Sequence, residues 1–137
     1  TLWHVLEHVH TLNETLQNLK KCLSEKGHMI IAVPNPDSHD AKKYGSNWAG
    51  YDVPRHLWHF TQETMNALLI RNGLHLVAVK PMKLDSYYVS LLSEQYKRPE
   101  QPKFITAINA FSEGLISNFH AKKNTEYSSL IYIARHK

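Results

Sequence analysis

The fold class is decided by residues 11–34, which read TLNETLQNLKKCLSEKGHMIIAVP. The leucines of this stretch recur at the spacing of one face of an amphipathic helix, namely Leu12, Leu16, Leu19 and Leu23. Thr11 or Asn13 can cap the start of that helix, and Gly27 supplies the left-handed residue that ends it. The continuous apolar run Met29–Val33 then predicts a strand that is covered on both faces.

The flanking segments extend this pattern into a layered α/β domain. Leu2–Leu6 predicts the end of a buried strand, so that strand, helix and strand form a βαβ unit with parallel strands and a right-handed crossover. Downstream patterns predict, in order, a short helix near Ser38–Tyr44, a helix between Thr61 and Gly73, a strand at Leu74–Val79, a helix at Ser86–Gln95, a helix with a core-like stripe (Phe104, Ile108, Phe111, Leu115 and Phe119) and a strand at Ser129–Ala134. We therefore expect one domain over residues 1–137, with helices on the faces of a sheet.

The composition limits the classes of partner. The chain has 137 residues, a formal net charge of +4 and ten histidines. Its basic residues occur in scattered pairs such as Lys20–Lys21 and Lys122–Lys123, whereas nucleic-acid binders gather them on one face. No apolar run approaches the roughly 20 residues that cross a bilayer, and the single Cys22 favours a reducing compartment. We expect a cytoplasmic protein with a small-molecule substrate, no nucleic-acid partner and no membrane span.

Polar residues gather where the two predicted parallel strands end. His4–Val9 follows the first strand, and Pro34–Pro36 follows the second and leads into a long loop that reaches Phe60. Ligands of open α/β sheets bind beyond the carboxyl ends of the strands, and long loops inside compact domains are usually functional. The sequence therefore places the candidate site at this edge.

The same segments resemble a known family. The run Val5-Leu6-Glu7-His8-Val9, the strand Ile30–Val33 with its Pro34-Asn35 ending, and the string Tyr51–Thr61 are similar to segments of class I S-adenosylmethionine-dependent methyltransferases of the ubiquinone-biosynthesis type. This resemblance implies a Rossmann-like sheet in which the chain supplies strands four to seven, the last of them antiparallel. It also implies S-adenosylmethionine as the cofactor. The five glycines contain no Gly-x-Gly pair, so we expect the C-terminal portion of such a domain, without its glycine-rich cofactor loop.

The resemblance and the residue chemistry together suggest roles for individual side chains. The resemblance places His4, Glu7 and His8 beside the cofactor. A histidine with a pKa near neutrality suits the removal of a proton from the methyl acceptor, which makes His56 and His59 catalytic candidates. Arg55 can fix an anionic substrate through a bidentate contact.

Aromatic residues supply candidates for the acceptor pocket. Ligand sites favour aromatic walls with a few polar groups, and the substrate-binding candidates on this ground are Trp48, Tyr51, Tyr87 and Tyr88. Trp48 and Tyr51 could equally form a small core within their own loop. We expect methyl transfer to a small-molecule or lipid-like acceptor, by the substrate-side part of a truncated enzyme.

Two other functions remain open at the level of sequence. The chain could be a non-catalytic fragment that forms a homodimer through the sheet edge left exposed by absent strands. It could instead be a histidine-rich metal-binding module, since His4, Glu7 and His8 are residue types that bind Zn²⁺. The alternative to a metal site is that the negative charge of Glu7 stabilises the start of the following helix. We therefore assign no metal ligand.

Overall fold

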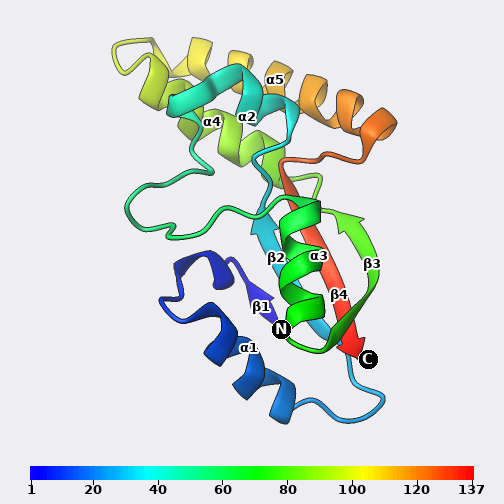
Figure 1. Cartoon of the computed structure of the whole chain (residues 1–137). Helices are drawn as coiled ribbons and strands as arrows, with labels where there is room; N and C mark the ends of the chain where they lie inside the picture. Colours follow the sequence, from blue (N-terminus) through cyan, green and yellow to red (C-terminus); the bar gives the residue numbers. More distant parts are fainter.

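The computed structural model describes residues 1–137 and has a four-stranded sheet in the order β1-β2-β4-β3 (Figure 1). The strands are β1 (Leu2–Trp3), β2 (Met29–Pro34), β3 (Leu74–Pro81) and β4 (Ser129–His136). β1 and β2 are parallel, and β4 lies antiparallel between β2 and β3. The expected partial Rossmann-like sheet with an antiparallel last strand is therefore confirmed.

The helices lie in two groups. α1 (Leu12–Lys21) connects β1 to β2, and α3 (Gln62–Arg71) lies against the sheet before β3. The others gather beyond the end of β2 (Figure 1): α2 (His39–Tyr44), α4 (Asp85–Lys97) and α5 (Lys103–Asn124). Two 3-10 turns, η1 (Leu6–His8) and η2 (Gly45–Asn47), occur in the loops that follow β1 and α2. No helix of the structure combines the length and the apolar character that a bilayer crossing requires.

Local sequence signals explain where several elements begin and end. The Ser38 hydroxyl accepts a hydrogen bond from the Ala41 amide at 3.2 Å and caps α2. Thr61 and Thr64 form a reciprocal capping box at the start of α3. Gly73 has a φ of 68°, the left-handed conformation that follows a helix end at little cost for glycine.

The main core forms between the sheet and the helices α1 and α3. Leu16 of α1 and both Met65 and Leu69 of α3 are fully buried. They pack in one cluster with Ile31 of β2 and Tyr132 of β4. The leucine stripe that predicted α1 is thus the face that packs toward the sheet, and the βαβ unit forms as expected.

Three sequence expectations are wrong. Gly27 does not end the first helix, because α1 already ends at Lys21 with Cys22 as its C-cap, and Gly27 is not left-handed. The first strand covers only Leu2–Trp3, because the chain leaves the sheet at His4, and both Trp3 and Val5 are exposed. The predicted core stripe of α5 is also exposed on every one of its members: Phe104, Ile108, Phe111, Leu115 and Phe119. The opposite face of α5 packs inward with small and polar residues.

Candidate functional site

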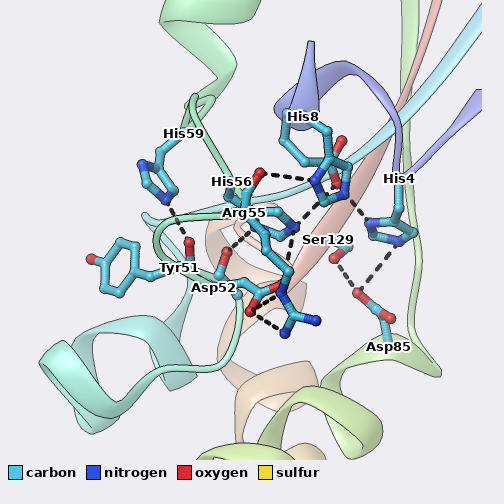
Figure 2. Close-up of polar contacts among 11 residues, drawn as sticks. His4, His8, Tyr51, Asp52, Arg55, His56, His59, Asp85 and Ser129 are labelled. Carbon is cyan, nitrogen blue, oxygen red and sulfur yellow. Dashed lines mark hydrogen bonds and ion pairs between the residues drawn. The ribbon is translucent and has the colours of Figure 1, made fainter. Parts of the chain in front are cut away.

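In the turn after β1 a histidine and a glutamate lie close together, and an aspartate from α4 lies beside the histidine. His4 has a φ of 52°, and its backbone amide still donates to the Ala32 carbonyl at 3.0 Å. This left-handed residue ends the strand, and the His4 side chain lies beside η1 (Figure 2). Its Nδ1 donates to Oε1 of Glu7 at 3.2 Å, and its Nε2 lies 3.9 Å from Oδ2 of Asp85 at the start of α4.

Glu7 is the buried centre of the site. Its side chain is 1% exposed, and Oε2 has no hydrogen-bond partner. Its backbone carbonyl accepts hydrogen bonds from the amides of Leu57 and Trp58 at 2.8 and 3.2 Å. The Trp58 indole donates to the Val9 carbonyl at 2.7 Å. These bonds tie the 51–60 loop to η1, so two of the three segments that carry the resemblance form one unit.

The 51–60 loop brings His56 beside Glu7. Nδ1 of His56 lies 2.9 Å from the Gly50 carbonyl oxygen, which can only accept, so Nδ1 carries a proton. In the neutral ring Nε2 is then an acceptor. It lies 4.0 Å from Oε1 of Glu7 and 3.9 Å from Oδ2 of Asp52. His56 therefore presents a basic nitrogen between two carboxylates.

His4, Asp52 and His56 border a cavity of about 280 Å³ at the end of β2, which we call the strand-end cavity, whereas Glu7 is not part of its lining. Its lining comes from the strand ends, the long loop and α4, and it consists of His4, Pro34, Ala49, Gly50, Asp52, Arg55, His56, Asp85, Tyr88, Val89, Leu92 and Tyr96. Small-molecule pockets usually have volumes of about 300–1,000 Å³ and a few convergent polar groups, so this cavity has the polar groups of such a pocket and lies just below its usual volume.

The local charges favour a protonated His4. The hydrogen bond to Glu7 raises the pKa of His4, burial opposes this, and the Asp85 carboxylate adds to the rise. Burial raises the pKa of Asp85, although the Ser129 hydroxyl donates to its Oδ2 and favours the charged form. Glu7 and Asp85 therefore both favour the charged form of the His4 ring that borders the cavity.

Only part of the predicted catalytic set reaches the cavity. His56 and Arg55 line it, whereas His59 does not. Nε2 of His59 donates to the Tyr51 carbonyl at 3.0 Å instead. The Arg55 guanidinium is exposed and bonds Oδ1 of Asp52 through both Nε and Nη2, at 3.1 and 2.6 Å (Figure 2). Arg55 is therefore already paired within its own loop.

The predicted aromatic residues divide in the same way. Tyr88 lines the strand-end cavity. Trp48 is buried and donates its indole proton to Asp40 at 2.8 Å, and Tyr51 packs edge-on against its ring at 5.0 Å. Tyr87 stacks on Phe111 of α5, away from the cavity. Trp48 and Tyr51 thus build the core of the loop that carries His56.

Three side chains could also hold a metal ion. Glu7, His8 and His56 each offer a ligand atom, and these atoms lie within 4.8 Å of one another. Nδ1 of His8 donates to the Arg55 carbonyl at 3.0 Å, as Nδ1 of His56 does to Gly50. Histidines that bind metals usually donate their second nitrogen to a carbonyl or carboxylate. His4 faces Glu7 and Asp85 and is not part of this set.

Sequence reasoning missed Asp85 and Tyr96. Both line the cavity from α4, whose predicted start at Ser86 excluded Asp85. The only sequence signal for Asp85 was an acidic residue in the first turn of a helix that follows a strand. Acidic residues are common at helix starts for electrostatic reasons alone, so this signal does not indicate a ligand site. Only the contact between Asp85 and His4 in the structure links Asp85 to the candidate site.

Comparisons with known proteins bear on the fold and the family. A family model described as a methyltransferase domain matches residues 1–79. A solved structure described as a sarcosine dimethylglycine methyltransferase from Galdieria sulphuraria has the same fold, with a TM-score of 0.51 and 13% sequence identity over 97% of this chain. The chain spans about half the length of that structure, covering 50% of it. No curated protein is found to match the chain.

Proposed function

Because this chain belongs to a methyltransferase domain family, we propose that the strand-end cavity is the acceptor side of a site for methyl transfer from S-adenosylmethionine. The acceptor is a small-molecule or lipid-like compound. The observation that carries this proposal is that His4, Glu7 and His56 lie close together beside one cavity. One oxygen of the buried Glu7 carboxylate has no hydrogen-bond partner. The position of the cavity beyond the strand ends is the usual ligand position in open α/β sheets.

The residues assigned to the cofactor fit part of its chemistry. S-adenosylmethionine carries an ammonium group and ribose hydroxyls, all of which are hydrogen-bond donors. Oε2 of Glu7 is a buried acceptor without a partner, and such an atom gains most from a donor. We assign Glu7 to accept from the cofactor, with His4 orienting the carboxylate through its bond to Oε1. The cofactor, when bound, supplies an electrophilic methyl group on a sulfonium sulfur.

We assign to His56 the removal of a proton from the acceptor. Methyl transfer is an in-line displacement, so the protein aligns the two partners and, for a hydroxyl, takes up a proton. Nε2 of His56 is the free basic nitrogen beside the cavity, because Nδ1 is held by the Gly50 carbonyl. Asp52 and Glu7 near this nitrogen stabilise the ring once it is charged. Tyr88 and Tyr96 border the space for the acceptor.

Titration calorimetry with S-adenosylhomocysteine tests the cofactor assignment, with light scattering on the same sample to give the mass of the binding unit. We expect Glu7→Gln to weaken binding by about tenfold or more, since a hydrogen bond to a charged group contributes about 1.5–3 kcal/mol. Glu14→Gln on the exposed side of α1 is the matched control and should not change the affinity. A folded sample that does not bind, or equal binding by Glu7→Gln, would overturn the assignment.

A second candidate function is the binding of a divalent metal by Glu7, His8 and His56. The specific support is the pair of histidines whose Nδ1 atoms donate to backbone carbonyls, which leaves both Nε2 atoms as free ligands. Two imidazoles and a carboxylate are a common Zn²⁺ ligand set. Glu7 would supply one carboxylate oxygen to such a metal.

Zinc titration monitored by thermal unfolding separates this second candidate from the first. Zinc binding by the three residues should raise the Tm of the wild type, and a chelator should reverse the rise. His56→Ala should lose the effect, whereas His59→Ala, which removes a neighbouring histidine outside the set, should keep it. A shift of Tm that survives His56→Ala would mean that the metal binds elsewhere.

A further inference from the structure

Helix α5 has its large apolar residues on the outside. The exposed residues Phe104, Ile108, Phe111, Leu115 and Phe119 form one row along the helix, which we call the α5 outer face. The buried residues of α5 lie about half a turn away and are small or polar: Thr106, Ala110, Glu113, Gly114, Ser117 and Ala121. Three phenylalanines of the outer face are 75%, 59% and 61% exposed. This pattern is the reverse of a core helix and marks an interaction surface.

The outer face continues into a groove beside α4. The groove has a volume of about 780 Å³, and its lining includes Leu84, the N-cap of α4, and Tyr87 of α4 together with Leu115 and Phe119 of α5. Leu84 is 81% exposed. The apolar surface therefore spans two helices and is larger than a single row of side chains.

The charges around this surface have one sign. The only acidic residue of α5 is Glu113, which is buried and paired with Lys43 on the inner side. Lys83 and Lys122 line the groove, and the Lys123 ammonium lies 5.8 Å from the centre of the Phe119 ring. Exposed phenylalanines flanked by lysines, without exposed carboxylates on the helix, are complementary to an anionic surface with an apolar interior.

We propose that the α5 outer face adsorbs to a lipid membrane that contains anionic phospholipids. The helix has 22 residues and is about 33 Å long, and a helix of this kind lies in the plane of the interface with its apolar side chains among the acyl chains. The lysines then meet the headgroups, where each strengthens binding by about fivefold.

The same charges disfavour a second copy of the chain as the occupant. In an antiparallel pair of α5 helices Lys103 lies near Lys122 and Lys123 of the other copy, and in a parallel pair each lysine lies near its equivalent. The outer face offers no carboxylate to compensate either arrangement. Like charges placed together in this way oppose association.

Vesicle co-sedimentation of the full chain tests the proposal. The probes are vesicles of phosphatidylcholine alone and vesicles in which about a third of the lipid is phosphatidylglycerol. We expect binding to the anionic vesicles that weakens with added salt. Phe104→Ser combined with Phe119→Ser should reduce binding by about a hundredfold, because each buried phenylalanine contributes about a factor of ten. Ile70→Ser, at a similarly exposed position on α3, is the control and should bind as the wild type does.

Both substituted phenylalanines are exposed, so the double variant should keep the far-ultraviolet circular dichroism of the wild type. Failure of the wild type to bind anionic vesicles would overturn the proposal, as would equal binding by the double variant. Light scattering supplies a third contrary result. A dimeric wild type that becomes monomeric in the double variant would assign the face to self-association.

Discussion

The backbone carbonyl of Glu7 accepts a hydrogen bond from the amide of Leu57 at an N···O distance of 2.8 Å. This bond joins the turn after β1 to the long loop that follows α2. The candidate site therefore depends on how firmly the loop is docked on η1. The loop is held there by three further bonds, from Trp58 to Glu7 and Val9 and from His8 to Arg55.

Trp58→Phe should loosen the docked loop. The substitution keeps an aromatic ring and removes the indole bond to the Val9 carbonyl, which should cost about 1 kcal/mol of the free energy of unfolding. Limited proteolysis should cut the variant faster within residues 51–60. Trp3→Phe is the control, because the Trp3 side chain is similarly exposed and makes no hydrogen bond. Equal loss of stability in both variants would contradict this role of Trp58.

His4→Gln should change the pH dependence of stability. The contacts with Glu7 and Asp85 raise the pKa of His4 above 6.5, so the charged ring stabilises the fold fully below that pH. This contribution disappears as the pH rises through the raised pKa. Urea unfolding should therefore show a larger difference between wild type and variant near pH ~5.5 than near pH ~8.5, by about 0.5–1 kcal/mol after solvent screening. His75→Gln on the exposed side of β3 should show no such pH dependence.

Asp40→Ala should destabilise the whole group of helices beyond the sheet. The buried Asp40 carboxylate accepts hydrogen bonds from the Trp48 indole and from the hydroxyls of Ser117 and Ser128, and so joins α2, the long loop, α5 and the segment before β4. Its removal should cost about 3 kcal/mol or more, because three buried donors lose their acceptor. Chemical denaturation measures this loss. Asp37→Ala, which removes a side chain without hydrogen bonds, should cost less than about 1 kcal/mol.

Two leucines that look alike in sequence should respond very differently to truncation. Leu16→Ala creates a cavity in the main core and should cost about 2–5 kcal/mol. Leu115→Ala shortens a side chain of the α5 outer face and should change stability by less than about 0.5 kcal/mol. A large loss for Leu115→Ala would mean that the outer face is covered within the protein itself.

This contrast also explains how far the fold could be predicted from the sequence. Periodicity specifies which residues share one face of a helix, and it therefore predicted that α1 and α5 exist and where each begins. Their ends differ from the prediction, because α1 ends at Lys21, well before Gly27, and α5 continues to Asn124. Periodicity does not specify whether that face is covered. The α1 stripe meets the sheet, whereas α5 packs inward through Thr106, Ala110 and Ser117, whose small side chains allow close approach to α2 and α4.

The site was predictable where it depends on strand ends and short motifs. Glu7, His8 and His56 were named from their places after β1 and in the long loop, and they lie together. The contact between His4 and Asp85 was not predictable, because it depends on the packing of α4 against the end of β1. The placement of His59 and Tyr87 outside the cavity depends on side-chain directions that no sequence pattern encodes.

We propose that the paired η1 turn and 51–60 loop form the ligand site. Nuclear magnetic resonance of the chain with added S-adenosylhomocysteine tests this claim, because the method also detects weak binding. We predict shift changes of the His4, His8 and His56 ring signals and of the amides of Glu7 and Leu57, with none at His75 on β3 and with their loss in Glu7→Gln. Unchanged spectra of a folded sample, or shifts confined to the groove between α4 and α5, would contradict the claim.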